Sequence, residues 1–124
     1  MDQCIFCTLE KSRIIDETET YYVIRDAFPV SELHTLLIPK RHSETYFDLS
    51  KDELSNLPEI LKRHRDLILR EDRNVTGFNI GINVGEDAGQ TIFHCHIHLI
   101  PRRKGDLENP RGGVRGVIPN KKIY

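Results

Sequence analysis

Three histidines, His94, His96 and His98, stand at every second position of one stretch, with apolar residues between them. This alternation, the β-branched residues nearby and the following Pro101 predict a strand that ends at the proline. Successive side chains of a strand point to opposite faces, so the three imidazoles would share one face. At about 3.3 Å per residue, neighbouring histidines would lie roughly 6.6 Å apart and the outer two roughly 13 Å apart.

This spacing limits how many of the three histidines can bind one metal ion. Two nitrogen ligands of a tetrahedral zinc ion lie only about 3.4 Å from each other. Two neighbouring histidines can lean onto one ion, whereas three in a row cannot. At least one imidazole is therefore left for other chemistry. An unperturbed imidazole, with a pKa of about 6.5, is largely neutral at about pH 7 and offers one nitrogen lone pair.

Two further groups could bind a metal or take part in catalysis. Cys4 and Cys7 form a Cys-x-x-Cys pair, which suits a metal knuckle, a redox couple or two buried apolar side chains. His34 and His42 flank a second apolar stretch that reads as a strand. Position alone does not decide whether either histidine is a ligand.

Composition bounds the class of protein. The 124 residues suit a single domain that buries about two-thirds of its unfolded surface. A net charge of -1 gives no bulk attraction to nucleic acid or to a membrane, so we expect neither as a partner. The start of the chain lacks a basic and apolar leader, and no stretch approaches roughly 20 apolar residues. With an odd number of cysteines, the expectation is a cytoplasmic protein with reduced or metal-bound thiols.

The remaining elements follow from periodicity and capping. Ser50 and Glu53 form a capping box that starts one long amphipathic helix, and Pro58 should kink or interrupt it. The residues expected on its apolar face are Leu54, Leu57, Leu61, His64 and Ile68. Besides the histidine strand, we expect strands at 13–15, 21–26, 34–39 and 77–84.

Glycine shapes two segments around the histidine strand. A tight turn at 85–89 would deliver the next residues to the head of that strand. Beyond Arg103 the sequence is rich in Gly, Pro and Arg, so residues 1–103 would form the domain and 104–124 a mobile or surface-draped tail. Arg111 or Arg115 could contact phosphate or a partner subunit.

Taken together, these motifs resemble the histidine triad (HIT) family of nucleotide hydrolases and transferases. Segment 94–100 matches the family signature His-φ-His-φ-His-φ-φ, in which φ is apolar, and segments 4–7 and 34–42 fall in family order. The resemblance spans roughly Cys4 to Arg102. Departures occur at Leu33 and Ala88, where glycine is usual, and at Cys95, where a larger aliphatic residue is usual. The resemblance implies an α+β, HIT-like fold with an antiparallel sheet of about five strands, one long and one short helix, and a homodimer.

The family chemistry implies a role for each matching residue. His96 would attack the α-phosphorus of a nucleoside phosphoramidate, an adenylated compound or a dinucleoside polyphosphate. Water would then hydrolyse the nucleotidyl-histidine intermediate, and the expected purine is adenine. The residues with an implied catalytic role are His96, His98, His34 and Gln90. Those implied to bind the nucleotide are Phe6, Ile24, Asp26, Asn83, Gln90, Thr91 and His98.

The same resemblance implies a structural zinc ion. Its ligands would be Cys4, Cys7, His42 and His94, which complete a tetrahedron and leave no open position. Other functions stay open at this point. The chain could be a transferase or phosphorylase of the same family, or a nucleotide-binding protein with little turnover. A zinc hydrolase would instead hold a catalytic ion between His94 and His96.

Overall fold

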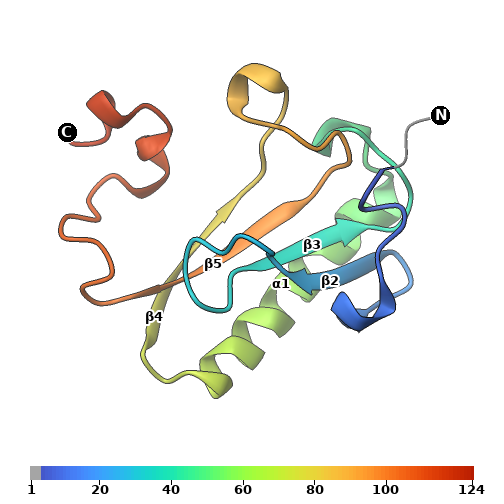
Figure 1. The fold of residues 1–124 in the computed structure, drawn as a ribbon, viewed down its shortest axis with the longest axis horizontal. Coiled ribbons are helices and arrows are strands. Elements are labelled where there is room, and N and C mark those ends of the chain that lie inside the picture. Colours follow the sequence, from blue (N-terminus) through green and yellow to red (C-terminus); the bar gives the residue numbers. More distant parts are fainter. Residues whose placement is uncertain (1–3) are drawn as a thin grey trace.

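The computed structural model describes residues 4–124, which form one five-stranded sheet and one α-helix, α1 (Lys51–Glu71) (Figure 1). The strands are β1 (Ile14–Glu17), β2 (Tyr21–Arg25), β3 (Thr35–Pro39), β4 (Val75–Gly81) and β5 (Ile97–Arg103). Their order across the sheet is β1-β2-β3-β5-β4, and each neighbouring pair is antiparallel. The predicted α+β class and five-stranded antiparallel sheet are confirmed.

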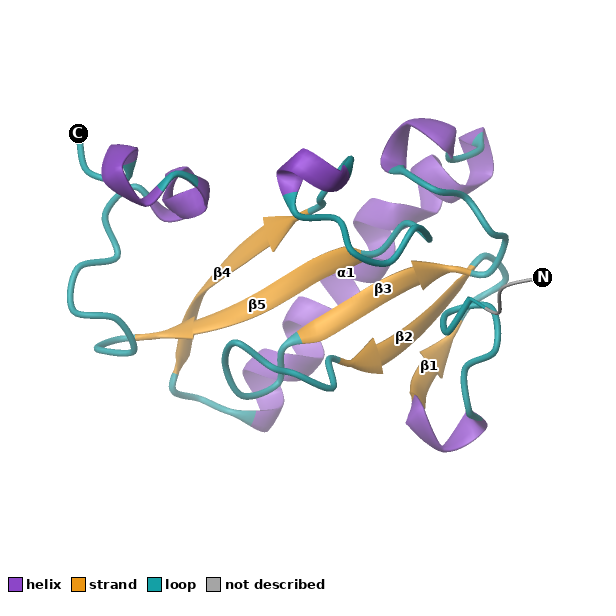
Figure 2. Ribbon diagram, turned by 45° about the horizontal axis from the view of Figure 1, so that its top comes forward, coloured by secondary structure: helices purple, strands orange, loops and turns teal. Residues whose placement is uncertain are grey.

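The sheet separates two apolar clusters. Figures 1 and 2 show α1 crossing behind the sheet, whereas the loop between β2 and β3 lies in front of it. On the helix side, Leu57 and Ile68 of α1 share a buried cluster with Leu37 of β3. On the opposite side, Phe6 of the amino-terminal segment packs with Ile24 of β2. Because both faces are covered, β3 is buried at every position.

The long helix begins as predicted. Ser50 Oγ accepts a hydrogen bond from the backbone N–H of Glu53, and the Glu53 carboxylate accepts one from the backbone N–H of Ser50. The helix runs uninterrupted through Pro58, so the predicted break is wrong. Pro58 is exposed, and water can satisfy the carbonyl that its missing N–H leaves free. Within residues 4–124 no helix combines the length and the apolar character that a membrane span needs.

The buried face of α1 is rotated slightly from the predicted one. Leu57, His64 and Ile68 are buried as expected, but Ile60 is buried where Leu61 was expected, and Leu54 is exposed. The buried positions still recur at spacings of three and four, so the helical period was predicted correctly, and the buried face is shifted by one residue at two of its five positions.

The histidine strand differs most from the prediction. β5 begins after His96, so only His98 of the three histidines lies on the strand, and the expected three-histidine strand face is wrong. The reason is that the backbone of Cys95 bonds to a loop and not to a neighbouring strand. Its N–H donates to the carbonyl of Ser43, a residue of the loop that follows β3, at 2.6 Å. His94 and His96 therefore stand in a loop segment before the strand.

Pro101 does not end β5, which continues through it to Arg103. The proline lies beyond the part of β5 that pairs with β3, so its missing N–H breaks no ladder bond on that side. The Pro101 carbonyl, which points to the same side, accepts a hydrogen bond from Ser31 Oγ at 2.6 Å.

The expected short helix is not an α-helix in the described part of the chain. Short 3₁₀ turns occur instead, at Lys11–Arg13, Tyr46–Asp48, Glu86–Ala88, Gly113–Val117 and Pro119–Lys121. The carboxy-terminal segment folds back on itself, with Lys122 Nζ donating to the Asn109 carbonyl at 2.6 Å. The guanidinium groups of Arg111 and Arg115 both lie over the Tyr124 ring. Whether either arginine contacts phosphate or a partner subunit stays a prediction.

Candidate active site

The loop between β4 and β5 carries His94 and His96. Gly85 and Gly89 have φ angles of 92° and 91°, which residues other than glycine rarely adopt, so the predicted glycine turn is confirmed. Gln90 then fixes the loop from inside. Its Oε1 accepts from the Gly85 N–H at 2.9 Å, and its Nε2 donates to two backbone carbonyls, at 2.6 and 3.2 Å. The buried amide uses both N–H donors within the protein and so supports the loop, and its implied role toward substrate stays a prediction.

The tautomer of His96 follows from one hydrogen bond. Its Nδ1 lies 2.8 Å from the carbonyl oxygen of His94. A carbonyl only accepts, so Nδ1 carries the proton and Nε2 of the neutral ring holds a lone pair. The Phe6 ring packs against this imidazole in a T-shaped arrangement, with ring centroids 5.1 Å apart. His96 thus combines a fixed orientation with one nucleophilic nitrogen.

His34 and His98 form a hydrogen-bonded pair. The Val30 N–H donates to Nδ1 of His34 at 3.0 Å, so Nδ1 bears no proton and Nε2 of the neutral ring must carry it. That Nε2 lies 2.9 Å from Nδ1 of His98 and donates to it. The proton of neutral His98 is therefore on its Nε2. His98 offers an N–H donor where His96 offers a lone pair.

Burial keeps this pair neutral. Burial, assisted by His96 and His34, lowers the pKa of His98 to about 4. Burial also lowers the pKa of His34, against the opposing attraction of Asp26, whose Oδ2 lies 3.5 Å from His34 Nε2. At neutral pH the N–H of His98 is therefore a dipolar donor and not a cation.

Leu33, the residue before His34, has a strained backbone conformation. Its φ of 72° lies in the left-handed region, where glycine is usual in the family. A non-glycine residue there costs roughly 1–2 kcal/mol. Two contacts offset part of this cost. Leu33 packs against the helix-side cluster, and Thr35 Oγ1 donates to the Leu33 carbonyl at 2.7 Å.

A cavity of about 230 Å³ adjoins the histidines. The predicted site residues that line it are Phe6, Asp26, Asn83, Thr91, His96 and His98. His34 and Gln90 lie outside the lining, behind His98 and inside the loop. Ile24, the implied base contact, is fully buried and does not line the cavity, whereas Leu36, its partner across β2 and β3, does.

Leu36, Phe28 and Arg13 are among the cavity residues that the sequence did not predict. Leu36 shares a sheet face with its cross-strand partner Ile24, so pairing of the two strands could have identified it. Phe28 is 89% exposed and lies in an irregular loop that carries no periodic signal. Arg13 lies in a polar segment, and only the pairing of β1 with β2 brings it beside Arg25, the residue before Asp26.

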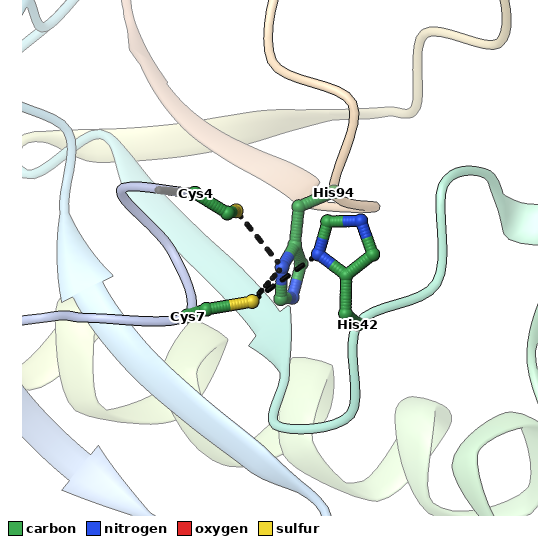
Figure 3. A group of neighbouring side chains, drawn as sticks. All are labelled: Cys4, Cys7, His42 and His94. Atoms are coloured by element: carbon green, nitrogen blue, oxygen red, sulfur yellow. Dashed lines mark hydrogen bonds between the residues drawn. The ribbon is translucent and has the colours of Figure 1, made fainter. Parts of the chain in front are cut away.

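Two thiols and two imidazoles gather next to the cavity (Figure 3). The ligand atoms of Cys4, Cys7, His42 and His94 all lie within 4.8 Å of one another. Cys4 Sγ is 3.3 Å from His94 Nδ1, and Cys7 Sγ is 3.2 Å from His42 Nδ1. Sulfur and nitrogen ligands of a tetrahedral zinc ion would lie roughly 3.6 Å apart. The four predicted ligands are thus together, at a spacing that suits zinc.

His94 is oriented toward the thiols by a second contact. Its Nε2 lies 2.7 Å from the carbonyl oxygen of Pro39, so Nε2 carries the proton and Nδ1 presents its lone pair to the two sulfur atoms. A carbonyl behind the ligating ring is the usual partner of a metal-binding histidine. On the cysteine side, the Cys7 N–H donates to the Cys4 carbonyl at 3.0 Å and closes a tight turn.

The sheet, the histidine cluster and the Cys/His group define a histidine triad protein, and comparison with known proteins agrees. Residues 8–105 match the HIT domain family model. The chain therefore belongs to the HIT domain family.

Named relatives include two hydrolases and a zinc protein. An adenosine 5'-monophosphoramidase from Candida albicans is 33% identical over 107 residues, which cover 81% of this chain and 70% of the relative. A bis(5'-adenosyl)-triphosphatase from Dictyostelium discoideum is 37% identical over 101 residues, covering 82% and 67%. A Zn-bound histidine triad family protein from Mycobacterium smegmatis superposes with a TM-score of 0.74 at 34% identity, covering 86% of this chain and 79% of that one. Nucleotide hydrolases thus occur among the relatives of this chain.

Proposed function

We propose that this protein hydrolyses nucleoside phosphate derivatives through a covalent intermediate on His96. Nε2 of His96 attacks the α-phosphorus, a phosphorus–nitrogen bond forms, and the leaving group departs with the electron pair of the bond that breaks. Water then attacks the same phosphorus. The electron pair of the phosphorus–nitrogen bond returns to Nε2, one water proton goes to solvent, and a nucleoside monophosphate is released.

The single observation that carries this proposal is the pair of opposite tautomers. His96 has its proton on Nδ1, tied to the His94 carbonyl, so the lone pair of Nε2 is free to attack. His98 has its proton on Nε2, because His34 donates to its Nδ1. A hydrogen bond from His98 stabilises negative charge on the phosphate or leaving atom without full proton transfer. A nucleophile and an adjacent donor are what this chemistry needs.

The relatives support the substrate class. An adenosine 5'-monophosphoramidase and a bis(5'-adenosyl)-triphosphatase both resemble this chain. Their names place a nitrogen leaving group in one case and a phosphate leaving group in the other. We therefore propose nucleoside phosphoramidates and dinucleoside polyphosphates as the substrates to test first. In this assignment Asp26 accepts the ribose hydroxyls, while Asn83 and Thr91, both lining the cavity, contact the phosphate.

A catalytic zinc between His94 and His96 is disfavoured by where their free nitrogens are. His94 presents Nδ1 to the cysteines, whereas His96 has its Nδ1 occupied by the His94 carbonyl. Among residues 4–124, no group of three or more neighbouring metal-ligand atoms contains both histidines.

We propose instead that Cys4, Cys7, His42 and His94 hold a structural zinc ion. The ion would bind two thiolates and two imidazoles and leave no position for water. It would fasten the amino-terminal segment, including Phe6, to the loop that carries His94. The spacing of the four ligand atoms and the Zn-bound relative support this.

A homodimer, as the family resemblance implies, is also proposed. β4 is an edge strand of the sheet, and a groove beside it is lined by Leu61, Phe78 and Ile80. Ile80 is 51% exposed, which leaves apolar surface for a second copy to cover. Analytical ultracentrifugation would give the mass of the assembly.

Turnover and adduct trapping test the proposed activity. The purified protein should release AMP from adenosine phosphoramidate, from diadenosine tetraphosphate or from both. Rapid acid-free quenching followed by mass spectrometry should detect a nucleotidyl adduct on the peptide that contains His96. His96→Ala should abolish both release and adduct, because no other cavity residue offers an equivalent lone pair. Undiminished turnover in this variant would overturn the nucleophile assignment.

A control for His96→Ala is a variant that removes a histidine outside the cavity lining. His64 is buried on α1 and its Nε2 lies 2.8 Å from Asp16 Oδ2, and neither residue lines the cavity. His64→Gln should lower the melting temperature yet keep turnover and adduct formation at temperatures where it is folded. Loss of activity in His96→Ala alone would then reflect its chemistry and not a general effect of losing a histidine.

A further inference from the structure

Arg13 is a cation in the cavity with no assigned role. It ends the 3₁₀ turn before β1, and its side chain lines the cavity. Its Nη2 donates to the Arg25 carbonyl at 3.2 Å, the single hydrogen bond that the guanidinium makes within residues 4–124. No carboxylate in this range lies within ion-pair distance of it, although five other arginines have one. A guanidinium has five N–H donors, so most of these donors are available to a ligand.

The order of the strands fixes which part of a nucleotide would meet Arg13. His98 lies on β5, Asp26 follows β2, and Arg13 precedes β1, while the sheet order is β1-β2-β3-β5-β4. At about 4.8 Å per strand, β1 lies roughly 14 Å from β5. A nucleotide runs from phosphate through ribose to base. With the phosphate at His98 and the ribose at Asp26, as in the proposed function on which this step rests, the base extends toward β1 and Arg13.

We propose that Arg13 reads the edge of the base and makes the site selective for guanine. Guanine presents two acceptors, O6 and N7, on one edge, and an arginine fork donates to both. Adenine presents N7 together with an amino donor, which would face the N–H groups of the arginine. Of the other residues that line the cavity, Phe6, Leu36 and Phe28 are apolar and offer no hydrogen bond that distinguishes the two purines. The Arg25 carbonyl anchors one side of the guanidinium and limits its freedom.

Equilibrium binding of nucleoside monophosphates tests this directly, because it needs no turnover. The wild-type protein should bind GMP on the order of tenfold more tightly than AMP, in line with one bidentate contact. IMP keeps O6 and N7 but lacks the amino group of guanine, so it should bind like GMP. In 7-deaza-GMP the N7 acceptor is missing, and binding should weaken toward that of AMP.

Two substitutions of Arg13 distinguish the bidentate geometry of its guanidinium group from its positive charge. Arg13→Met removes every donor and should weaken GMP binding to the level of AMP while leaving AMP nearly unchanged. Arg13→Lys keeps the charge without the planar fork and should retain only part of the preference. Equal weakening of GMP and AMP in Arg13→Met would place the contact on ribose or phosphate and overturn the proposal. So would a wild-type protein with no preference, or IMP that binds like AMP.

The same samples distinguish failure of this inference from failure of the proposed function. Turnover and the His96 adduct are measured with both guanosine and adenosine phosphoramidates. Intact chemistry with equal binding of the two bases would reject the Arg13 assignment alone. Absence of turnover and of the adduct, together with a clear GMP preference, would reject the covalent mechanism and leave base reading by Arg13 supported. No measurable binding of any of the nucleotides would reject the Arg13 assignment, whereas turnover and the His96 adduct decide on the proposed function.

Discussion

Two clusters in this protein contain similar residues but suit different chemistry. The group Cys4, Cys7, His42 and His94 and the group Asp26, His34 and His98 each bring their ligand atoms within 4.8 Å. In the first, the Pro39 carbonyl accepts from Nε2 of His94 and leaves Nδ1 bare toward the thiols. In the second, the Val30 N–H donates to Nδ1 of His34 and puts a proton on the nitrogen that faces His98.

The difference shows that a backbone partner, rather than the residue type, decides what a histidine cluster can do. A bare nitrogen aimed at two sulfur atoms is ready for a metal ion. A protonated nitrogen aimed at a second imidazole excludes a metal from that position and sets the tautomer of its neighbour instead. The first group should therefore contribute mainly to stability, and the second to turnover.

Metal removal is expected to give the largest effect and to act on stability. A ligand present at about 100 times its dissociation constant stabilises the native state by about 2.7 kcal/mol, so chelation should lower the melting temperature by several degrees. The KM should rise as well, because Phe6 lies between Cys4 and Cys7 and packs on His96. The kcat should change little. Calorimetry and steady-state kinetics on the same chelated sample would measure both.

Cysteine variants control this experiment. Cys4→Ala should lose bound zinc and show no response to chelator. Cys95→Ala removes a thiol that is buried outside the cluster, so it should be less stable but keep its zinc content and its response. A chelated protein that keeps its melting temperature and loses kcat at once would show that the Cys/His group is catalytic.

The sequence predicted the four members of the Cys/His group and six of the residues that line the cavity, because these residues match motifs of the HIT family. It did not predict where β5 begins, since alternation at 94–100 looks like a strand whether or not the chain pairs there. The Cys95–Ser43 hydrogen bond that decides the matter joins distant segments. Arg13 was missed for the same reason, because only strand pairing brings it to the cavity. Contacts between segments far apart in the chain carry no local signal.

The role of Gln90 illustrates a second limit. Family order placed it near the nucleotide, and it does adjoin cavity residue Thr91. Its amide, however, is bonded to three backbone groups of the loop and of the segment after β3. A residue type and position predict that a polar group is present, whereas the partner it bonds depends on how the loop closes.

Substitution of His34 should have a smaller effect that falls on turnover. His34→Leu removes the donor to His98 Nδ1, which frees His98 to place its proton on the wrong nitrogen. Loss of one hydrogen bond of about 1–1.5 kcal/mol predicts a roughly tenfold lower kcat. In His34→Gln, an amide N–H can replace the imidazole N–H and should recover most of the rate. Steady-state kinetics would measure both, at temperatures where melting curves show each variant to be folded.

If the hydrogen bond from His34 to His98 sets the rate, His34→Leu and His34→Gln must differ in kcat. If His34→Gln were as slow as His34→Leu while both are folded, the hydrogen bond to His98 would not set the rate. Normal turnover in both variants would remove His34 from the active site altogether.

The smallest effect concerns the dependence of stability on pH. His98 has its pKa lowered by burial to about 4 in the folded protein, against about 6.5 for an unperturbed histidine. Between these values the unfolded chain binds a proton that folded His98 does not, so the free energy of unfolding should fall as the pH falls from about 6.5 toward 4. His98→Gln should flatten this slope by less than about 1.4 kcal/mol per pH unit. Urea unfolding of both proteins across this range would measure the difference, and identical slopes would mean that His98 is not held neutral by the fold.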